Sequence, residues 1–547
     1  MGSVDTGLVA TPQGDVLSHR YGSNKQTFIL TLTFPDLSKA GNLLQKIKSG
    51  IHCWELRCDL LSPTGEPQES SVPPADYVEK QVRYLRSHSS LPILFSLRKK
   101  SHGGKFPDNE QQAALELLSL AIDLQCDYVE CDNDFPLETI NELVSRASET
   151  KIVGAQYISS RDTEWTSPAV EDIYRRIDQY ADIITLSIPS KEMEDCYDLA
   201  RFVRDHQQRS QKPIIAVSAG SNGRLSRFTA PITRVTHPSL PFAASSDLPT
   251  VIELNQARHL LGQLPKKKFH IFGHNISHSL SPTLHNAGFK ELGLPHHYSM
   301  HQTESVDATV AALINCEDFG GASVTFPHKL QVGKLLGSLS PVASKVGAVN
   351  TVVVRTLENG ERTLLGDNTD WLGIQRLINS TPLRDLQSSA ALVLGAGGAA
   401  RAACYAIEDL GIKDLIIVNR TRSKGEDMAS AFPNCNTHVF DTLEAASLNS
   451  PSSIRVIVAC VPADDLLEDK IPAALFGADT GVLVEMAYRP QVTGMMKVAG
   501  LKSGWNIFRG IDVLEEQAFA QFELWTEMPA PTLAMGAAMR AKASGKL

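Results

Sequence analysis

The sequence predicts an α/β protein, with an N-terminal (β/α)8 barrel followed by a two-lobed α/β unit that contains a Rossmann domain. Three observations lead to this prediction. Apolar, strand-like segments alternate with helical segments eight times between residues 27 and 245. An apolar strand, a glycine-rich turn and a helix follow one another around residue 395. The chain has 547 residues, which is too long for one hydrophobic core, so several domains are expected.

The eight expected barrel strands are almost wholly apolar, which is typical of parallel strands buried on both faces. The segments between them, such as residues 109–126, have apolar residues at helical spacing. The last strand has the weakest pattern because two prolines interrupt it. The strands are expected at residues 27–34, 51–56, 91–97, 127–131, 151–157, 182–188, 212–218 and 233–244.

Composition excludes several classes of protein. The net charge is −9 and the longest basic cluster is three lysines at 266–268, so direct binding to DNA is not expected. Nine cysteines without zinc-site spacing indicate reduced thiols in a cytoplasmic or nuclear protein, and no metal site is predicted. No run approaches ~20 apolar residues, so no membrane span is expected. Residues 1–24 lack the apolar core of a signal peptide and are expected to form a flexible arm.

Polar residues gather where the barrel strands end, which is where barrel enzymes place their chemistry. Arg57, Arg98 and Arg227 follow the second, third and seventh strands. A salt-bridge network at the rim is an equally good interpretation of Glu55 and its neighbours. The segments WELRCDLL, LFSLRKKSHGGKFP and NGRLSRF resemble the type I 3-dehydroquinate dehydratase family, over a domain expected at 25–258. The resemblance implies that the three arginines grip the substrate.

The resemblance fails at the reacting centre. The family uses a lysine that forms an imine with the substrate ketone and a histidine as general acid/base. Thr185 stands where the lysine belongs, and Tyr157 stands where the histidine belongs. His102 replaces a glutamate and Asp247 replaces a glutamine. A hydroxyl group forms no imine, so we expect a degenerate site that still binds an anion but has lost dehydratase activity.

The second half, after an expected linker at 259–268, has polar residues at strand ends and helix starts. HIFGHNISHSLSPTLHNAGF places Ser279 and Ser281 at the positive end of a helix, where a carboxylate would bind. Helix capping would explain Ser281 but not both serines. Lys329 and Asp370 form a plausible proton-transfer pair, because a carboxylate orients an ammonium group. Taken singly, each of these residues is better explained by a structural role.

The glycine turn predicts a dinucleotide site. In ALVLGAGGAARAACYAIEDLG the turn would bring backbone and a helix N-terminus to a pyrophosphate. The next strand ends in NRTRSK, where an NAD site would carry an acidic residue, so NADP is predicted over NAD. A Rossmann-like fold that binds nothing is the alternative. The expected cofactor-binding residues are Gly395, Ala396, Gly397, Gly398, Ala399, Asn419, Arg420 and Thr421, with Arg422 as a further candidate.

Together these motifs resemble shikimate dehydrogenase over residues 269–540. The resemblance implies a substrate domain at 269–380 plus 510–547 and an NADP domain at 381–509. It implies that Lys329 and Asp370 are catalytic in hydride transfer between NADPH and 3-dehydroshikimate. Glu485 stands where an aspartate is usual, and a mild effect is expected. The residues implied to bind substrate are Ser279, Ser281, Thr325, Asn350, Tyr488 and Gln517.

The two resemblances together are similar to plant dehydratase–dehydrogenase fusions, the C-terminal part of fungal arom proteins, and the fungal quinate repressor family. The degenerate barrel favours the repressor family, whose members act through an activator protein rather than DNA. That family carries a kinase-like domain in front of the barrel, and this sequence has no phosphate-loop motif. Because the barrel site is degenerate, we nevertheless expect a regulator of quinate catabolism that binds shikimate, 3-dehydroshikimate or quinate. The alternative is an active NADP-dependent shikimate or quinate dehydrogenase with the barrel as scaffold.

Overall fold

The computed structural model describes residues 15–18, 26–66, 72–243, 245, 247–357, 360–464 and 466–545. The expected arm at 1–24 therefore lies outside the described residues, except for 15–18. The chain forms two compact units. One contains the described residues from 15 to 265 together with 289–295, and the other contains the described residues of 266–288 and 296–545.

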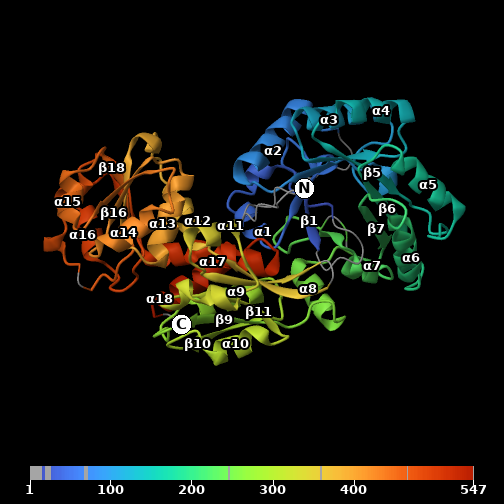
Figure 1. Ribbon diagram of the computed structural model, residues 1–547. Coiled ribbons are helices and arrows are strands. Elements are labelled where there is room, and N and C mark those ends of the chain that lie inside the picture. Colours follow the sequence, from blue (N-terminus) through green and yellow to red (C-terminus); the bar gives the residue numbers. More distant parts are fainter. Residues whose placement is uncertain are drawn as a thin grey trace. The chain divides into compact units, whose positions relative to one another are not determined.

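The first unit is the predicted (β/α)8 barrel, coloured blue to green in Figure 1. Its strands are parallel in the order β7-β6-β5-β4-β3-β2-β1-β8, and β7 and β8 adjoin without sharing a ladder, so the ring is nearly closed. The strands are β1 (Thr27–Leu32), β2 (Cys53–Arg57), β3 (Ile93–Ser96), β4 (Tyr128–Asp132), β5 (Lys151–Tyr157), β6 (Ile183–Pro189), β7 (Ile214–Ala219) and β8 (Ile232–Val235).

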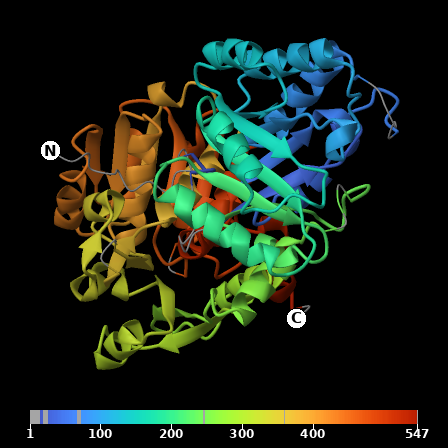
Figure 2. The same ribbon diagram turned by 90° about the vertical axis from the view of Figure 1, so that its right-hand side faces the viewer.

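The eighth strand is shorter than the predicted segment 233–244, because it ends at Val235. Pro238 and Pro241 follow it, and proline has no N–H to donate to a neighbouring strand. The outer helices lie around the strands, as Figure 2 also shows. They are α1 (Leu43–Ile47), α2 (Ala75–His88), α3 (Gln111–Asp123), α4 (Leu137–Arg146), α5 (Pro168–Asp178), α6 (Asp195–Gln207), α7 (Arg224–Thr229) and α8 (Val251–Leu260).

Residues 15–18 differ from the expected flexible arm, because they pack into one end of the barrel. Val16 and Leu17 are buried in a cluster with residues of all eight strands. The Tyr128 hydroxyl donates a 2.6 Å hydrogen bond to Asp15, which also pairs with Lys151. This segment therefore helps to close the end of the barrel where the strands begin.

The second unit contains two sheets. The first has the order β10-β9-β11-β13-β14-β12, with antiparallel pairing of β13 to both neighbours. Its strand ends and connections carry four of the six residues expected to bind substrate, namely Ser279, Ser281, Thr325 and Asn350. Its elements are β9 (Lys268–Gly273), α9 (Ser281–Glu291), β10 (His297–Gln302), α10 (Ala308–Asn315), β11 (Phe319–Val324), β12 (Ser338–Leu339), α11 (Pro341–Val346), β13 (Thr351–Thr356) and β14 (Arg362–Asp367).

The second sheet is the predicted Rossmann sheet, parallel throughout in the order β17-β16-β15-β18-β19-β20. Helices α13 and α14 cover one face and α15 and α16 the other, each over an apolar cluster. The elements are β15 (Ala390–Leu394), α13 (Gly398–Asp409), β16 (Asp414–Val418), α14 (Arg422–Ala429), β17 (Asn436–Phe440), α15 (Leu443–Leu448), β18 (Ile454–Ala459), β19 (Gly481–Glu485), α16 (Gly494–Ala499) and β20 (Trp505–Phe508).

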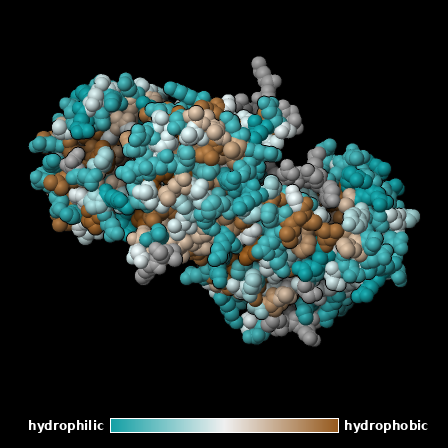
Figure 3. Space-filling view, turned by 90° about the horizontal axis from the view of Figure 1, so that it is seen from below, coloured by the Kyte–Doolittle hydropathy of each residue, from teal (hydrophilic) through white to brown (hydrophobic). Residues whose placement is uncertain are grey.

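Three further helices complete the second unit: α12 (Asp370–Asn379), α17 (Gly510–Thr526) and α18 (Thr532–Ala543). Helices α12 and α17 pack against each other, which brings residues 370 and 517 to the same region. The segment expected as a linker is partly helical, because α8 extends to Leu260 and β9 begins at Lys268. No helix among the described residues is long and apolar enough to cross a membrane. The face drawn in Figure 3 is mostly hydrophilic, with hydrophobic residues in separate small patches.

Candidate active site in the second unit

A cleft of about 560 Å³ in the second unit brings together most of the predicted site residues. They come from the ends of strands in both sheets and from the starts of α9, α12 and α13. Helix α17 contributes Gln517. The predicted residues that line the cleft are Ser279, Ser281, Thr325, Lys329, Asn350, Asp370, Gly397, Gly398, Ala399, Tyr488 and Gln517. Those outside its lining are Gly395, Ala396, Asn419, Arg420 and Thr421.

Lys329 and Asp370 form a largely buried ion pair in this cleft. The Lys329 Nζ atom lies 2.5 Å from Oδ2 of Asp370, and the two side chains are 19% and 7% exposed. Lys329 lies in a short 3-10 helix after β11, and Asp370 is the first residue of α12. The positive end of α12 stabilises a carboxylate there. The pair can hold a proton next to a bound molecule, as a general acid/base requires.

Asn350 fixes the position of Asp370. Its Nδ2 group donates to Oδ1 of Asp370 at 2.9 Å, so it engages the carboxylate oxygen that does not face Lys329. The Asn350 Oδ1 atom accepts from the Thr369 backbone at 2.7 Å and from the Thr351 hydroxyl at 2.6 Å. Gln517 joins this network through its Oε1 atom, 3.2 Å from Nδ2 of Asn350. The site is therefore ordered by hydrogen bonds from three separate segments.

Three hydroxyl groups line the other part of the cleft. Ser279 and Ser281 lie at the start of α9, and Thr325 follows β11. The helix begins at Ser281, whose backbone N–H donates to the Ser279 hydroxyl at 3.3 Å, so Ser279 rather than Ser281 receives a capping bond. Hydroxyl donors at a helix N-terminus suit a carboxylate group. Tyr488 lines the same cleft from the segment after β19.

Glu485, the expected mild departure, supports the segment that carries Tyr488. Its carboxylate accepts from the Thr493 hydroxyl at 2.7 Å and from the Ala487 backbone at 3.0 Å. Burial raises the pKa of Glu485 against these hydrogen bonds. Glu485 is absent from the lining of the cleft, so its extra methylene group acts on the turn and not directly on a ligand.

The glycine turn fits a dinucleotide pyrophosphate. Gly395 has a φ of +111°, which a residue with a side chain rarely adopts, and a Cβ there would lie 3.2 Å from the Cys460 carbonyl oxygen. A Cβ on Gly397 would meet nothing within 4 Å, so the backbone at the start of α13 is open. Helix α13 begins at Gly398, and its N-terminus favours a negative charge. These residues provide the backbone cradle that NAD or NADP requires.

The end of β16 carries the residues expected to choose between cofactors. Asn419 bonds the Thr421 carbonyl at 2.8 Å and so shapes the turn. Arg420 and Thr421 are exposed. Arg422 is held by Glu426 at 2.9 Å within α14. Arg420 forms no ion pair with any residue that the structure describes, so it is the better candidate to receive a phosphate.

Several polar residues of the cleft lining were not predicted, and Gln521 is the one tied most closely to the catalytic network. It donates to the Thr351 hydroxyl at 2.9 Å and accepts from Ser323 at 2.7 Å. It thereby supports the hydroxyl that orients Asn350. Gln517 and Gln521 are four positions apart, which places both on one face of α17. This spacing in the sequence could have indicated Gln521.

A second cavity, in the barrel

The predicted residues of the barrel also lie together, around a cavity of about 320 Å³ at the ends of the strands. Those that line it are Arg57, Arg98, His102, Tyr157, Thr185, Arg227 and Asp247. Arg234 of β8 lines it too and was not predicted. The sequence could have indicated Arg234, because it is a charged residue inside an otherwise apolar strand.

The arginines of this cavity are paired with carboxylates. Arg57 binds Asp59 through two hydrogen bonds of 2.7 and 2.6 Å. Arg234 lies 3.0 Å from Glu55 and also binds Glu130. Arg98 lies 3.6 Å from Glu55. The salt-bridge network that was one interpretation of Glu55 is therefore present. It includes Arg57, Arg98 and Arg227, the arginines that the family resemblance assigns to substrate binding.

Thr185 and Tyr157 occupy the centre. The Thr185 hydroxyl is buried and has no hydrogen-bond partner in the described part of the chain. Tyr157 donates to Glu130 at 2.8 Å and accepts from Arg98 at 3.0 Å, and the Arg98 guanidinium lies 4.2 Å from the centre of its ring. Burial raises the pKa of Tyr157, so its hydroxyl stays protonated. Neither residue supplies an amine nucleophile.

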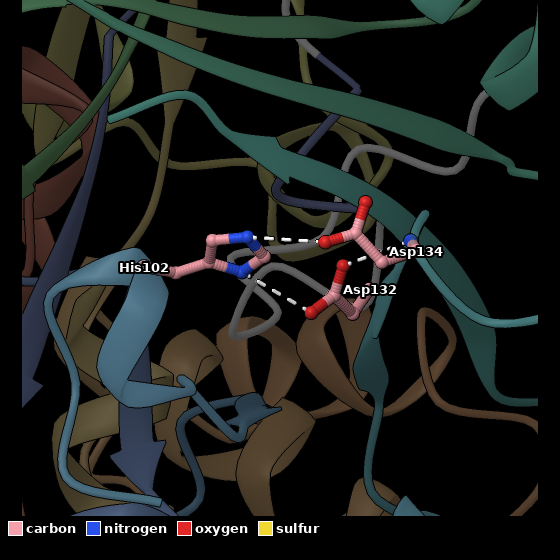
Figure 4. Close-up of side chains that lie close together, drawn as sticks. All are labelled: His102, Asp132 and Asp134. Atoms are coloured by element: carbon pink, nitrogen blue, oxygen red, sulfur yellow. Dashed lines mark hydrogen bonds and ion pairs between the residues drawn. The ribbon is translucent and has the colours of Figure 1, made fainter. Parts of the chain in front are cut away.

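His102 joins two aspartates at the edge of the cavity (Figure 4). One ring nitrogen lies 3.2 Å from Asp132 and the other lies 3.2 Å from Asp134. The hydrogen bond to Asp132 outweighs burial and raises the pKa of His102. Lys99 lies 3.2 Å from the same oxygen of Asp132. The two carboxylates lie at ion-pair distance from different ring nitrogens, so a protonated imidazole would have a negative charge beside each of its N–H groups.

Similarity to known proteins

Family models match in both units. The model for type I 3-dehydroquinase covers residues 28–265. The model for the shikimate dehydrogenase substrate binding domain covers 271–352, and that for shikimate / quinate 5-dehydrogenase covers 378–465. The model for the shikimate 5'-dehydrogenase C-terminal domain covers 510–540. The fold and these matches define the class as a type I dehydroquinase barrel fused to shikimate dehydrogenase domains.

The fusion itself occurs in known proteins. The structure of dehydroquinate dehydratase and shikimate dehydrogenase from S. pombe AroM is 34% identical, with a TM-score of 0.81, and the match covers 95% of this chain and 99% of that one. The chain belongs to this family of dehydroquinate dehydratase–shikimate dehydrogenase fusions. The pentafunctional AROM polypeptide of Malassezia globosa is 40% identical over 92% of this chain and 31% of its own length. The chain thus spans about a third of such curated relatives.

A shikimate dehydrogenase structure matches half of this chain. Shikimate 5-dehydrogenase from Thermus thermophilus, solved in complex with NADP(H) and shikimate, is 31% identical. The match covers 50% of this chain and 98% of that one, with a TM-score of 0.43.

Proposed function

We propose that the cleft catalyses NADP-dependent oxidation and reduction of a hydroxylated ring acid, with shikimate and 3-dehydroshikimate as the pair of substrates and quinate as a second candidate. The observation that carries this proposal is the Lys329–Asp370 pair, 2.5 Å apart and held by Asn350 in a cleft that also includes the glycine turn. A structural ion pair alone gives no reason for three hydroxyl groups and an open backbone turn in the same cleft.

In the oxidation direction, the Lys329 amine takes the proton of the ring hydroxyl while hydride leaves the carbon that bears this hydroxyl. In the reduction direction, the Lys329 ammonium returns a proton to the carbonyl oxygen. Asp370 orients the ammonium group and balances its charge. Ser279, Ser281 and Thr325 bind the carboxylate of the substrate. Asn350, Tyr488 and Gln517 bind its ring hydroxyls and fix the reacting carbon.

NADP⁺, when bound, accepts the hydride. Gly397, Gly398 and the N-terminus of α13 would hold its pyrophosphate. Arg420 and Thr421, both exposed at the end of β16, would receive the 2′-phosphate. This assignment favours NADP over NAD, since NAD lacks the 2′-phosphate that these two residues would bind.

The test is NADP⁺ reduction, followed by absorbance, with shikimate and then with quinate. Lys329→Ala is expected to lower kcat by roughly 100- to 10,000-fold, the usual contribution of general acid/base catalysis. Lys334→Ala is the matched control, because Lys334 lies outside the cleft lining. Turnover that survives in Lys329→Ala at the wild-type rate would disprove the proposed role of this lysine.

We also propose that the barrel lacks dehydratase activity. The support is chemical, because Thr185 lies in the centre of the cavity where an imine-forming amine is needed, and Tyr157 is engaged by Glu130 and Arg98. In the presence of NADPH, the wild-type chain is expected to form no 3-dehydroshikimate and no shikimate from 3-dehydroquinate. Appearance of shikimate from 3-dehydroquinate would show that the barrel dehydrates it by another route.

A second candidate function is regulation of quinate catabolism through a transcription-activator protein. One observation favours it, namely a barrel that retains its cavity and arginines without an amine nucleophile. A regulator of this kind would sense ring acids in the cleft. Measurable binding of shikimate or quinate without turnover, together with capture of a zinc-cluster activator, would favour regulation over catalysis. Turnover that depends on Lys329 would make any regulatory role additional.

A further inference from the structure

The barrel cavity has no part in the proposed dehydrogenase reaction, and its polar groups carry a separate inference. Four guanidinium groups and several hydroxyl groups line it. Among the described residues of its lining, Asp247 is the one carboxylate. The other carboxylates around the cavity, Glu55, Asp59 and Glu130, lie behind the arginines and outside the lining.

Asp247 is bound to Arg227 and held from two further directions. Its Oδ2 atom accepts from Nη2 of Arg227 at 2.7 Å and from Nε at 3.1 Å. The Gly220 backbone donates to the same oxygen at 3.2 Å, and the Ser245 hydroxyl donates to the other oxygen. Both side chains of the pair are less than a tenth exposed. Asp247 therefore occupies the place that the carboxylate of a bound acid would take on Arg227.

The charge of Asp247 is stable at neutral pH. Burial opposes ionisation, but Arg227 and the hydrogen bonds from Ser245 and Gly220 outweigh it and hold the pKa of Asp247 below its ordinary value. Arg57 is matched by Asp59, and Arg234 by Glu55 and Glu130. An incoming carboxylate would thus enter a buried space in which these cations are already neutralised, and a buried charge without a partner is costly.

Two buried polar groups at the cavity lack a hydrogen-bond partner among the described residues. The Thr185 hydroxyl and Nε of Arg98 are buried, and neither has a hydrogen-bond partner among the described residues. Thr185 is only 1% exposed, and both residues line the cavity. A hydroxyl and an N–H group can be satisfied by the hydroxyl oxygens of an uncharged molecule, which bring no charge into the cavity.

We propose that the barrel cavity is a binding site for a small, uncharged, polyhydroxylated molecule, and that Asp247 sets this selectivity by occupying Arg227. The cavity thereby rejects carboxylic acids of the same shape. Replacement of Asp247 by asparagine removes one negative charge with little change in shape and leaves Arg227 available for an acid. This inference goes beyond the proposed dehydrogenase function and holds whether or not the cleft turns over.

The experiment uses the full chain and two probes that differ mainly in charge: quinate and its uncharged carboxamide. Hydrogen exchange read by mass spectrometry locates the bound probe. Peptides covering 97–106 and 218–227 report on the barrel cavity, and peptides covering 323–330 report on the cleft. In the wild type, the carboxamide is expected to slow exchange in the barrel peptides, and quinate is expected to leave them unchanged. Any response of the cleft peptides is read separately, so failure of the proposed function does not affect the result.

In Asp247→Asn, quinate is expected to protect the barrel peptides with an apparent Kd at least about tenfold lower than in wild type. Asp134→Asn is the matched control, because Asp134 lies at the same edge but contacts His102 and not Arg227. In this control, quinate is expected to leave hydrogen exchange in the barrel peptides unchanged. Equal protection by quinate and the carboxamide in wild type, or none by the carboxamide, overturns the proposal. That comparison needs no variant, so it decides the matter even if Asp247→Asn does not fold.

Discussion

Nδ2 of Asn350 lies 2.9 Å from Oδ1 of Asp370, on the side of the carboxylate opposite to Lys329. Asn350 comes from the segment before β13, Asp370 begins α12, and Lys329 follows β11. The proton-transfer pair is thus held by a residue from a third segment. Asn350 is 2% exposed, so its hydrogen bonds are protected from water.

Replacement of Asn350 by alanine is expected to lower kcat more than it raises KM. A hydrogen bond to a charged group contributes about 1.5–3 kcal/mol, which corresponds to roughly a 10- to 100-fold loss of rate when the bond serves the transition state. Steady-state kinetics with NADP⁺ and shikimate measures both constants. A large rise in KM at unchanged kcat would show that Asn350 acts on substrate binding alone and does not position Asp370.

The fold was largely predictable because the chain signals its elements locally. Buried parallel strands read as apolar runs, and the glycine turn stands between a strand and a helix. The error at the eighth strand has a local cause as well. An apolar pattern continues past Val235, but Pro238 and Pro241 remove the N–H groups that a longer ladder needs.

The site was predictable only where a motif marked it. Lys329, Asn350 and Asp370 lie in recognisable segments, and the structure brings them together. Arg234 and Gln521 were missed because their roles depend on partners far along the chain. Arg234 meets Glu55, 179 positions away, and Gln521 meets Ser323 across 198 positions. Closure of the barrel and packing of α17 create these contacts, and no local pattern reports them.

Arg420 is expected to determine the choice of cofactor. Replacement by alanine removes the exposed cation at the end of β16 without breaking an ion pair among the described residues. The KM for NADP⁺ should rise roughly tenfold, the equivalent of ~1.4 kcal/mol, and the KM for NAD⁺ should stay unchanged. Arg422→Ala is the control, since Arg422 is already engaged by Glu426. A similar rise for both cofactors would assign Arg420 to the fold of the turn.

Thr185 is the position at which an amine would restore imine chemistry in the barrel. In Thr185→Lys, the new amine would lie at a position that is 1% exposed in the wild type, and burial favours its deprotonated, nucleophilic form. Borohydride reduction with 3-dehydroquinate is expected to add a covalent adduct when Thr185→Lys is combined with Asp247→Asn, which leaves Arg227 available for the acid, and to add none to the wild type. Intact-protein mass spectrometry measures this. An adduct on the wild type would mean that another lysine already reacts.

His102 is expected to make the edge of the barrel cavity sensitive to pH. Its hydrogen bond with Asp132 and the charges of Asp132 and Asp134 raise its pKa above the ordinary value of 6.5. The folded state therefore binds the proton more tightly than the unfolded state does. The stabilisation is fully present below pH 6.5, the unfolded value, and is lost as pH rises through the higher folded value.

Hydrogen exchange in residues 98–106, which carry His102, measures this effect locally. Exchange rates, corrected for the intrinsic pH dependence of amides, should rise in the wild type as pH increases through the folded pKa of His102. In His102→Gln the corrected rates should be higher at low pH and nearly independent of pH. His259→Gln is a suitable control, because Nδ1 of His259 bonds the Leu264 backbone carbonyl instead of a carboxylate. A wild-type profile that is flat, or that rises toward acid, would show that the two aspartates do not hold a protonated imidazole.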